Sequence, residues 1–203
     1  MPEQRIAYHI KTDQPLPVEP FPYREPDKSQ GVGNPWTVLF ALDISWSMEG
    51  ELLDNAKQAI IKEAQSVLSS SGTKAGVVLF GSDTTKLCSP GSDVEEIVRK
   101  IGPVECNGST NMSGALAHCR DLLESEPDSV DREIVLLTDG MPDSSDETLA
   151  EARRVTEAGI TLSALAIGGG VDTDFLREMT PNVVVALEAR DIYDKLRVLT
   201  RKQ

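Results

Sequence analysis

Apolar runs and amphipathic stretches alternate along the chain from residue 36 onward. Each run has six or seven residues, is rich in Val, Ile, Leu and Phe, and carries few polar positions. Such runs are typical of strands that are buried on both faces. The expected buried strands are 36–42, 75–80, 133–138, 161–167 and 182–187. The expected helices are 51–70, 94–101, 111–123, 144–159, 172–179 and 191–201.

The helix expected at 51–70 has an amphipathic pattern. Its apolar residues recur at spacings of three and four, which places them on one helical face. They are Leu53, Ala56, Ile60, Ala64 and Val67. Farther along, Ser144 followed by Glu147 has the spacing of a capping box and predicts a helix start.

Alternating strands and helices with uniformly apolar strands predict the α/β class. We expect a doubly wound, mainly parallel central sheet with helices on both faces. Residues 84–88 return after the turn at 81–83 and predict a short antiparallel edge strand.

Residues 1–35 form a Pro-rich N-terminal arm, distinct from the domain expected at 36–203. The arm holds seven of the twelve prolines, and 15–22 is predicted to be extended and polyproline-like. Ile6, Tyr8 and Ile10 alternate with other residues in a short strand pattern. Packing along a sheet edge, binding another chain and loose attachment all remain open for this arm.

The chain has a formal net charge of −13, of which about −12 lies on residues 36–203. An acidic body repels nucleic acid and anionic membranes, so nucleic-acid binding is not expected. No apolar run is long enough to span a membrane, and no secretory signal is visible. The three cysteines, Cys88, Cys106 and Cys119, are widely spaced, which indicates free thiols and a cytoplasmic protein.

Candidate chemistry begins where the first apolar run ends. Asp43, Ser45 and Ser47 follow it at every second position, so in an extended backbone their side chains converge. Carboxylate and hydroxyl oxygens are hard ligands that suit Mg²⁺ or Mn²⁺. Thr110 precedes a predicted helix and Asp139 follows the strand at 133–138. Because ligands bind at the carboxyl ends of such strands, these residues are expected at one edge of the sheet.

These motifs resemble the metal-ion-dependent adhesion site of the von Willebrand factor A domain. The match comprises Asp43-x-Ser45-x-Ser47, Thr110 in Gly-Ser-Thr-Asn-Met-Ser-Gly, and Asp139 in Leu-Leu-Thr-Asp-Gly, and it extends over about residues 36–200. The resemblance implies that the serine hydroxyls bind the metal and that Thr110 binds directly or through water. It implies that Asp43 and Asp139 act through water or orient the hydroxyls.

The resemblance also implies a function. Neutral hydroxyl ligands leave the cation able to accept a Glu or Asp carboxylate from a protein partner. We therefore expect a cytoplasmic, metal-dependent protein-binding domain that is not an enzyme. Family members without a signal sequence resemble scaffold partners of ATPase or chelatase machinery.

Two other functions remain open. The metal site can be vestigial, with binding through the arm or the final helix. A phosphohydrolase is less favoured, because sites of that kind resemble Asp-x-Asp and this chain has Ser45 at the position of the second Asp. A serine hydrolase would need a base, and the only histidines of the sequence are His9 and His118. Asp143 and Asp146 are interpreted as helix-capping and solvated residues. Trp46 and Met48 are candidates for the rim of the contact surface or for packing beneath it.

Overall fold

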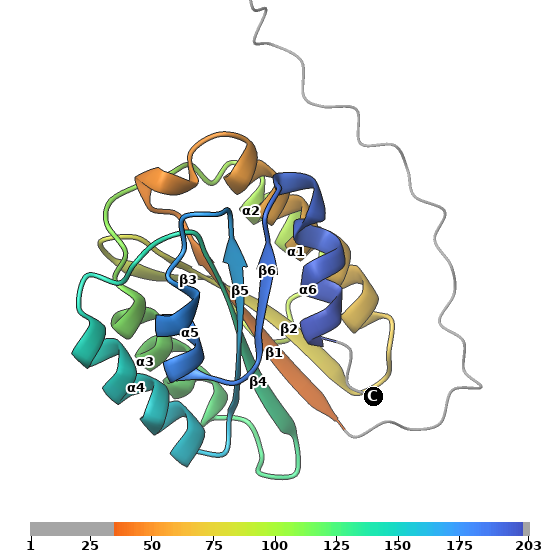
Figure 1. Cartoon of the computed structure of the whole chain (residues 1–203). Coiled ribbons are helices and arrows are strands. Elements are labelled where there is room, and N and C mark those ends of the chain that lie inside the picture. The colour runs from red at the N-terminus through yellow and green to blue at the C-terminus, as the bar shows by residue number, and fades with distance from the viewer. Residues whose placement is uncertain (1–34, 201–203) are drawn as a thin grey trace, which may run out of the picture.

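The structure, a computed structural model, describes residues 35–200, which form a three-layer α/β fold (Figure 1). The strands are β1 (Trp36–Asp43), β2 (Thr73–Phe80), β3 (Thr84–Cys88), β4 (Asp131–Thr138), β5 (Thr161–Ile167) and β6 (Val183–Ala186). The α-helices are α1 (Glu51–Leu68), α2 (Val94–Ile101), α3 (Met112–Leu123), α4 (Ser145–Glu157), α5 (Thr173–Met179) and α6 (Ile192–Thr200). Two 3-10 turns, η1 (Trp46–Met48) and η2 (Ala189–Asp191), complete the set.

The strand order is β3-β2-β1-β4-β5-β6, and every neighbouring pair is parallel except β2 with β3. This confirms the predicted doubly wound sheet with one short antiparallel edge strand. Of the arm expected at 1–35, residues 1–34 lie outside the described part, so its predicted strand pattern and polyproline segment stay predictions.

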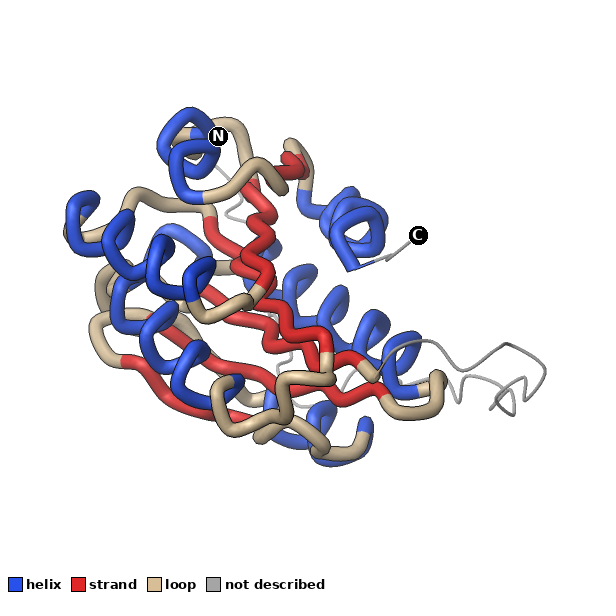
Figure 2. The backbone as a smooth tube through the Cα atoms, turned by 90° about the horizontal axis from the view of Figure 1, so that it is seen from below, coloured by secondary structure: helices blue, strands red, loops and turns tan. Residues whose placement is uncertain are grey.

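β1 is the central strand, and all eight of its residues are buried. Its side chains alternate between two apolar layers. Phe40 belongs to the core beneath α1 and α6, whereas Leu39 belongs to the core beneath α3 and α4. Figure 2 shows helices on both sides of the strands. Burial on both faces explains why this strand lacks the polar alternation of a half-exposed strand.

The predicted apolar stripe of α1 is buried along its whole length. Side-chain caps begin α4, as expected from its sequence, and α3. Ser144 Oγ accepts a hydrogen bond from Glu147 N (3.4 Å), and Asn111 Oδ1 accepts one from Gly114 N (3.0 Å). No helix among residues 35–200 is long and apolar enough to cross a bilayer.

Several predicted boundaries were wrong by one or two residues. β4 begins two positions earlier, at Asp131, because Asp131 N donates to Pro35 O (2.9 Å) and extends the pairing with β1. β6 is shorter than the expected 182–187, since it is an edge strand that pairs only with β5. α1 ends at Leu68 instead of residue 70, and residue 201 lies outside the described range.

Candidate metal centre

Asp43 ends β1 and is fully buried at the carboxyl edge of the sheet. One carboxylate oxygen, Oδ1, accepts a hydrogen bond from Ser45 N (2.8 Å) and turns the chain out of the strand. The other, Oδ2, accepts one from Thr138 Oγ1 (2.6 Å) at the end of β4. Both oxygens are therefore engaged, and the carboxylate is held in one orientation.

The turn η1 brings the two serine hydroxyls together. Met48 is fully buried beneath the turn, and its N–H donates to Ser45 O (3.0 Å). Ser45 Oγ lies 3.1 Å from Ser47 Oγ, and Ser47 Oγ donates to Asp139 Oδ1 at 2.7 Å. Oxygens from β1, η1 and the end of β4 thus form a continuous chain.

Thr110 reaches the same place from the loop before α3. A Cβ placed on Gly140 would lie 3.4 Å from Thr110 Oγ1 and 3.7 Å from Ser47 Oγ, so both hydroxyls border this glycine. Thr110 is held by Asp143, which accepts hydrogen bonds from Thr110 N (3.0 Å) and Ser109 Oγ (2.7 Å). All five sequence-predicted residues therefore meet at one site.

Backbone hydrogen bonds join the loops that carry these side chains. Ile44 N donates to Phe80 O (2.8 Å), and Asn107 N donates to Ile44 O (2.6 Å). Trp46 N donates to Gly108 O (3.3 Å), where Gly108 has a φ of 86° that favours glycine. These bonds join the loop after β1 to the end of β2 and to the loop before α3.

The spacing of the oxygens fits a small octahedral cation. Ligand oxygens about 2.1 Å from Mg²⁺ lie about 3.0 Å from one another at neighbouring positions. The oxygen pairs from Ser45 to Ser47 and from Ser47 to Asp139 are 3.1 Å and 2.7 Å apart. Among residues 35–200, no three His, Cys, Asp or Glu side chains gather as a metal-binding group. Hydroxyl donors therefore supply most of this candidate site.

Burial raises the pKa of Asp43 from 3.8 to about 6, against the lowering effect of its hydrogen bonds from Thr138 and Ser45. Burial also raises the pKa of Asp139, which Ser47 opposes by donating a hydrogen bond. Both shifts disfavour the charged carboxylates. A bound cation would have the opposite effect on them, because it favours the ionised form.

The structure corrects the interpretation of Asp143 and adds Thr138 to the site. Ser144 caps α4, whereas Asp143, expected to be a capping or solvated residue, accepts hydrogen bonds from the Thr110 loop. The sequence pattern does not single out Thr138, although a polar residue at the end of an apolar strand is a usable signal. Trp46 is exposed and Met48 is buried, so of these two only Trp46 lies on the rim.

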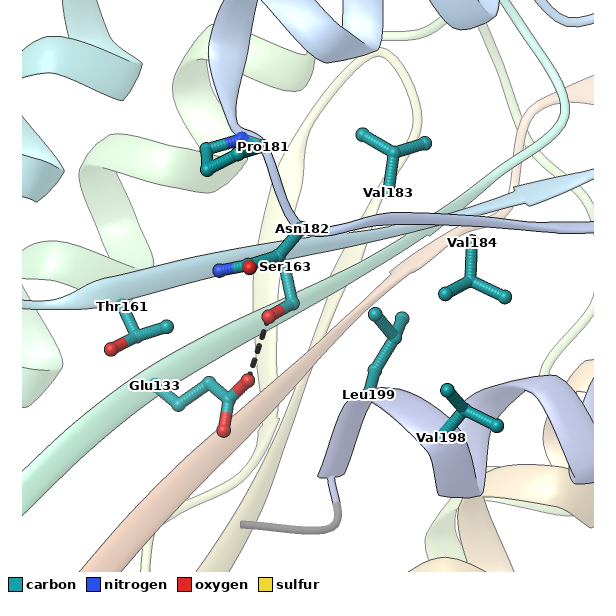
Figure 3. A pocket seen from close by; sticks show the side chains of 9 residues that line it. All are labelled: Glu133, Thr161, Ser163, Pro181, Asn182, Val183, Val184, Val198 and Leu199. Atoms are coloured by element: carbon teal, nitrogen blue, oxygen red, sulfur yellow. Dashed lines mark hydrogen bonds between the residues drawn. The ribbon is translucent and has the colours of Figure 1, made fainter. Parts of the chain in front are cut away.

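A separate hollow of about 360 Å³ lies at the other end of the strands from the metal centre, beside the end of α6 (Figure 3). Its buried Glu133 accepts a hydrogen bond from Ser163 Oγ (2.7 Å), and aliphatic side chains such as Val184 and Leu199 line it. It contains none of the five predicted residues. It borders the amino ends of β4, β5 and β6, whereas ligands of doubly wound sheets bind at the carboxyl ends.

Replacing Thr138 with Val is expected to lower the free energy of unfolding by about 2 kcal/mol. Valine keeps the shape but removes the hydroxyl that donates to Asp43 and accepts a hydrogen bond from Gly140 N (3.2 Å). Urea unfolding of metal-free protein measures the change. Thr138→Ser keeps the hydroxyl and is the control; an equal loss in both variants would contradict the role of this hydrogen bond.

A family model, the von Willebrand factor type A domain, matches residues 37–194. The thrombospondin-related anonymous protein of Plasmodium falciparum is 36% identical over 75 residues, covering 34% of this chain and 13% of that protein. The inter-alpha-trypsin inhibitor heavy chain H1 of Mesocricetus auratus is 28% identical over 166 residues, covering 70% and 17%. This chain therefore spans only a small part of the curated relatives it matches.

Solved structures show the same fold. Manganese-loaded TRAP protein of Plasmodium vivax superposes with a TM-score of 0.69 at 21% identity, covering 83% of this chain and 72% of that one. The family model confirms the expected family, whereas the expected metal ligands stay a prediction. Because the family model covers well over half of its residues, the chain belongs to the von Willebrand factor type A domain family.

Proposed function

We propose that this domain binds a protein partner through a divalent cation, Mg²⁺ or Mn²⁺. The observation that carries the proposal is the convergence of the Ser45, Ser47 and Asp139 oxygens, which are near enough to one another to coordinate a single small cation. The residues that would hold the cation are Asp43, Ser45, Ser47, Thr110 and Asp139. When bound, the cation supplies a positive centre for an anionic oxygen of the partner, a Glu or Asp carboxylate.

The residues around the site have distinct roles in this proposal. Ser45 and Ser47 present neutral oxygens, which leave much of a cation's charge available to a partner. Asp43 and Asp139 hold these groups in place, since they accept hydrogen bonds from Ser45 N and Ser47 Oγ. Asp143 positions Thr110 through its backbone N–H.

Two comparisons support this function. One structural neighbour is described as manganese-loaded TRAP protein, and another as a pilus adhesin of Lactobacillus rhamnosus. Metal loading and adhesion are properties of those proteins. They agree with the donor set found here, and we infer the same class of metal-dependent protein binding for this chain.

The domain is proposed to act in the cytoplasm, as a scaffold or an ATPase-associated partner. Its three cysteines support this location, because Cys88, Cys106 and Cys119 are all free and free thiols are typical of reducing compartments.

We propose that the domain has no catalytic activity of its own. A hydrolase that used a serine here would need a base beside it. The histidine in the described part of the chain is His118, which lies within α3 and not in the loops that carry Ser45 and Ser47.

The test is a calorimetric titration of Mg²⁺ and Mn²⁺ into chelator-treated protein. Saturable binding of one ion per chain is expected, and Asp139→Ala is expected to weaken it by about 10- to 100-fold because Ser47 loses its acceptor. Asp146→Ala is the matched control, since Asp146 is exposed in the first turn of α4. Absence of ion binding by the wild-type protein would contradict the proposal and favour a vestigial site.

A further inference from the structure

Two of the four large hydrophobic side chains that are exposed in residues 35–200 border the metal centre. Trp46 is 62% exposed and lies between Ser45 and Ser47 in the sequence. Met141 is 47% exposed and follows Asp139 by two positions. Exposed apolar groups beside a binding site are typical of contact surfaces.

The backbone of Trp46 is held by its surroundings. Its backbone N–H donates to Gly108 O (3.3 Å), its carbonyl accepts from Glu49 N (3.2 Å), and Met48 anchors the turn in the core. The other Trp and Phe side chains of residues 35–200 are buried, and Tyr193 is half-buried. An exposed tryptophan on a well-held backbone is a typical centre of binding energy in protein interfaces.

The loops at this edge of the sheet are strongly acidic. The loops are residues 43–50, 81–83, 102–111, 139–144, 168–172 and 187–191. Together they contain nine Asp or Glu residues and a single basic residue, Arg190, which forms an ion pair with Glu188. A divalent cation offsets only part of this charge, so an acidic run in the partner would be repelled. The occupant that fits has one carboxylate with large apolar residues on both sides.

This chain contains such a segment at residues 15–23, Pro-Leu-Pro-Val-Glu-Pro-Phe-Pro-Tyr. Glu19 is the sole charged residue between Asp13 and Arg24. The prolines favour an extended conformation before binding, which lowers the entropic cost of docking. On the folded domain, Glu188 also follows an exposed apolar residue, Leu187, but it forms an ion pair with Arg190 (2.6 Å).

We propose that residues 15–23 of a second copy of this chain dock on the metal centre, with Glu19 directed to the cation and its apolar neighbours against Trp46 and Met141. This inference rests on the proposed function, because it names the partner of the same site. The domain would then associate with itself when a divalent cation is bound.

A second copy is favoured over the chain's own arm by distance. Pro35 precedes β1, at the edge opposite the metal centre, and the eight residues of β1 span about 26 Å. A path from Pro35 around a helix layer to the centre is about 45 Å long. The 16 residue steps from Glu19 to Pro35 reach about 55 Å when fully extended. The chain's own arm would have to adopt about four-fifths of its full extension, whereas another copy's arm is not so constrained.

Sedimentation velocity of the full chain in MgCl₂ and in EDTA tests self-association. Concentration-dependent association is expected in MgCl₂ and is expected to disappear in EDTA and in Glu19→Gln. Trp46→Ala is expected to weaken association by about tenfold. Glu25→Gln in the arm and Val198→Ala, exposed at the end of α6, are matched controls that should leave it unchanged.

A mixing experiment separates the two halves of the contact. Glu19→Gln retains the metal centre, and Asp139→Ala retains the arm. Each variant alone is expected to stay monomeric in MgCl₂, and their mixture is expected to form heterodimers. A synthetic peptide of residues 13–25 should bind Glu19→Gln in MgCl₂ and shift the fluorescence of Trp46 to shorter wavelength.

Failure of the second-copy proposal can be distinguished from failure of the proposed function. A wild-type chain that binds Mg²⁺ in the calorimeter yet stays monomeric at all concentrations overturns the second-copy proposal and leaves the proposed function standing. If the monomeric wild type and its Glu19→Gln variant differ in Trp46 fluorescence in MgCl₂, the chain's own arm is the occupant. Absence of Mg²⁺ binding overturns both proposals.

Discussion

Gly81→Ala is expected to lower the free energy of unfolding by about 3 kcal/mol, among the largest effects of a single methyl group in this domain. Gly81 follows β2, and a Cβ at this position would lie 1.9 Å from Asn107 O. The contact is with backbone, so the loop itself must move. That loop also carries Thr110, so the substitution is expected to weaken metal binding as well.

The control is Gly169→Ala, because Gly169 is exposed and a Cβ there meets no atom within 4 Å. It is expected to leave stability unchanged or to raise it by up to about 1 kcal/mol. Urea unfolding compares the two variants with the wild type, and calorimetry measures their affinity for Mg²⁺. Equal stability of the two variants would show that the loops after β2 and before α3 do not approach as described.

Asp43→Asn is expected to gain stability relative to the metal-free wild type as the pH rises from 4 to 7. It starts from a lower stability at pH 4, because the amide NH2 replaces one of the two oxygens that accept hydrogen bonds from Ser45 N and Thr138 Oγ1. Burial raises the pKa of Asp43 from 3.8 to about 6 in the folded protein, so the folded state binds the proton more tightly than the unfolded state. Well below pH 3.8 the carboxyl is protonated in both states and has no such effect. As the pH rises through this window, the wild type loses stability by up to about 3 kcal/mol.

Asparagine does not ionise, so this loss is absent from the variant. The measurement is urea unfolding of both proteins at several pH values after metal removal, and the quantity compared is the difference between their free energies of unfolding. A difference that stays constant from pH 4 to pH 7 would contradict the burial of this carboxylate. Saturating Mg²⁺ at pH 7 is expected to raise the stability of the wild type, because a ligand of the folded state stabilises it.

Most of the fold was predictable because its signals are local. The apolar run at 36–42 and the stripe of α1 each reflect the periodicity of one element, and both are buried as expected. The ends of the elements were less predictable. Asp131 joins β4 because it pairs with a strand that lies far away in the sequence.

The candidate site was predictable to the level of its five residues, because each stands next to a recognisable strand or helix end. Their contacts were not predictable. Thr138 and Asp43 are 95 positions apart, and they meet because the parallel register places Leu42 opposite Leu137. Asp143 holds the Thr110 loop across 33 positions.

The sequence by itself determined the α/β class, the order of its elements and the identity of the residues that gather at the carboxyl edge. Periodicity and composition carry that information along the chain. Only the tertiary structure decided that Met48 lies in the core while Trp46 faces outward, and which hydroxyl each carboxylate accepts from. The physical reason is that these outcomes depend on strand register and loop packing between distant segments.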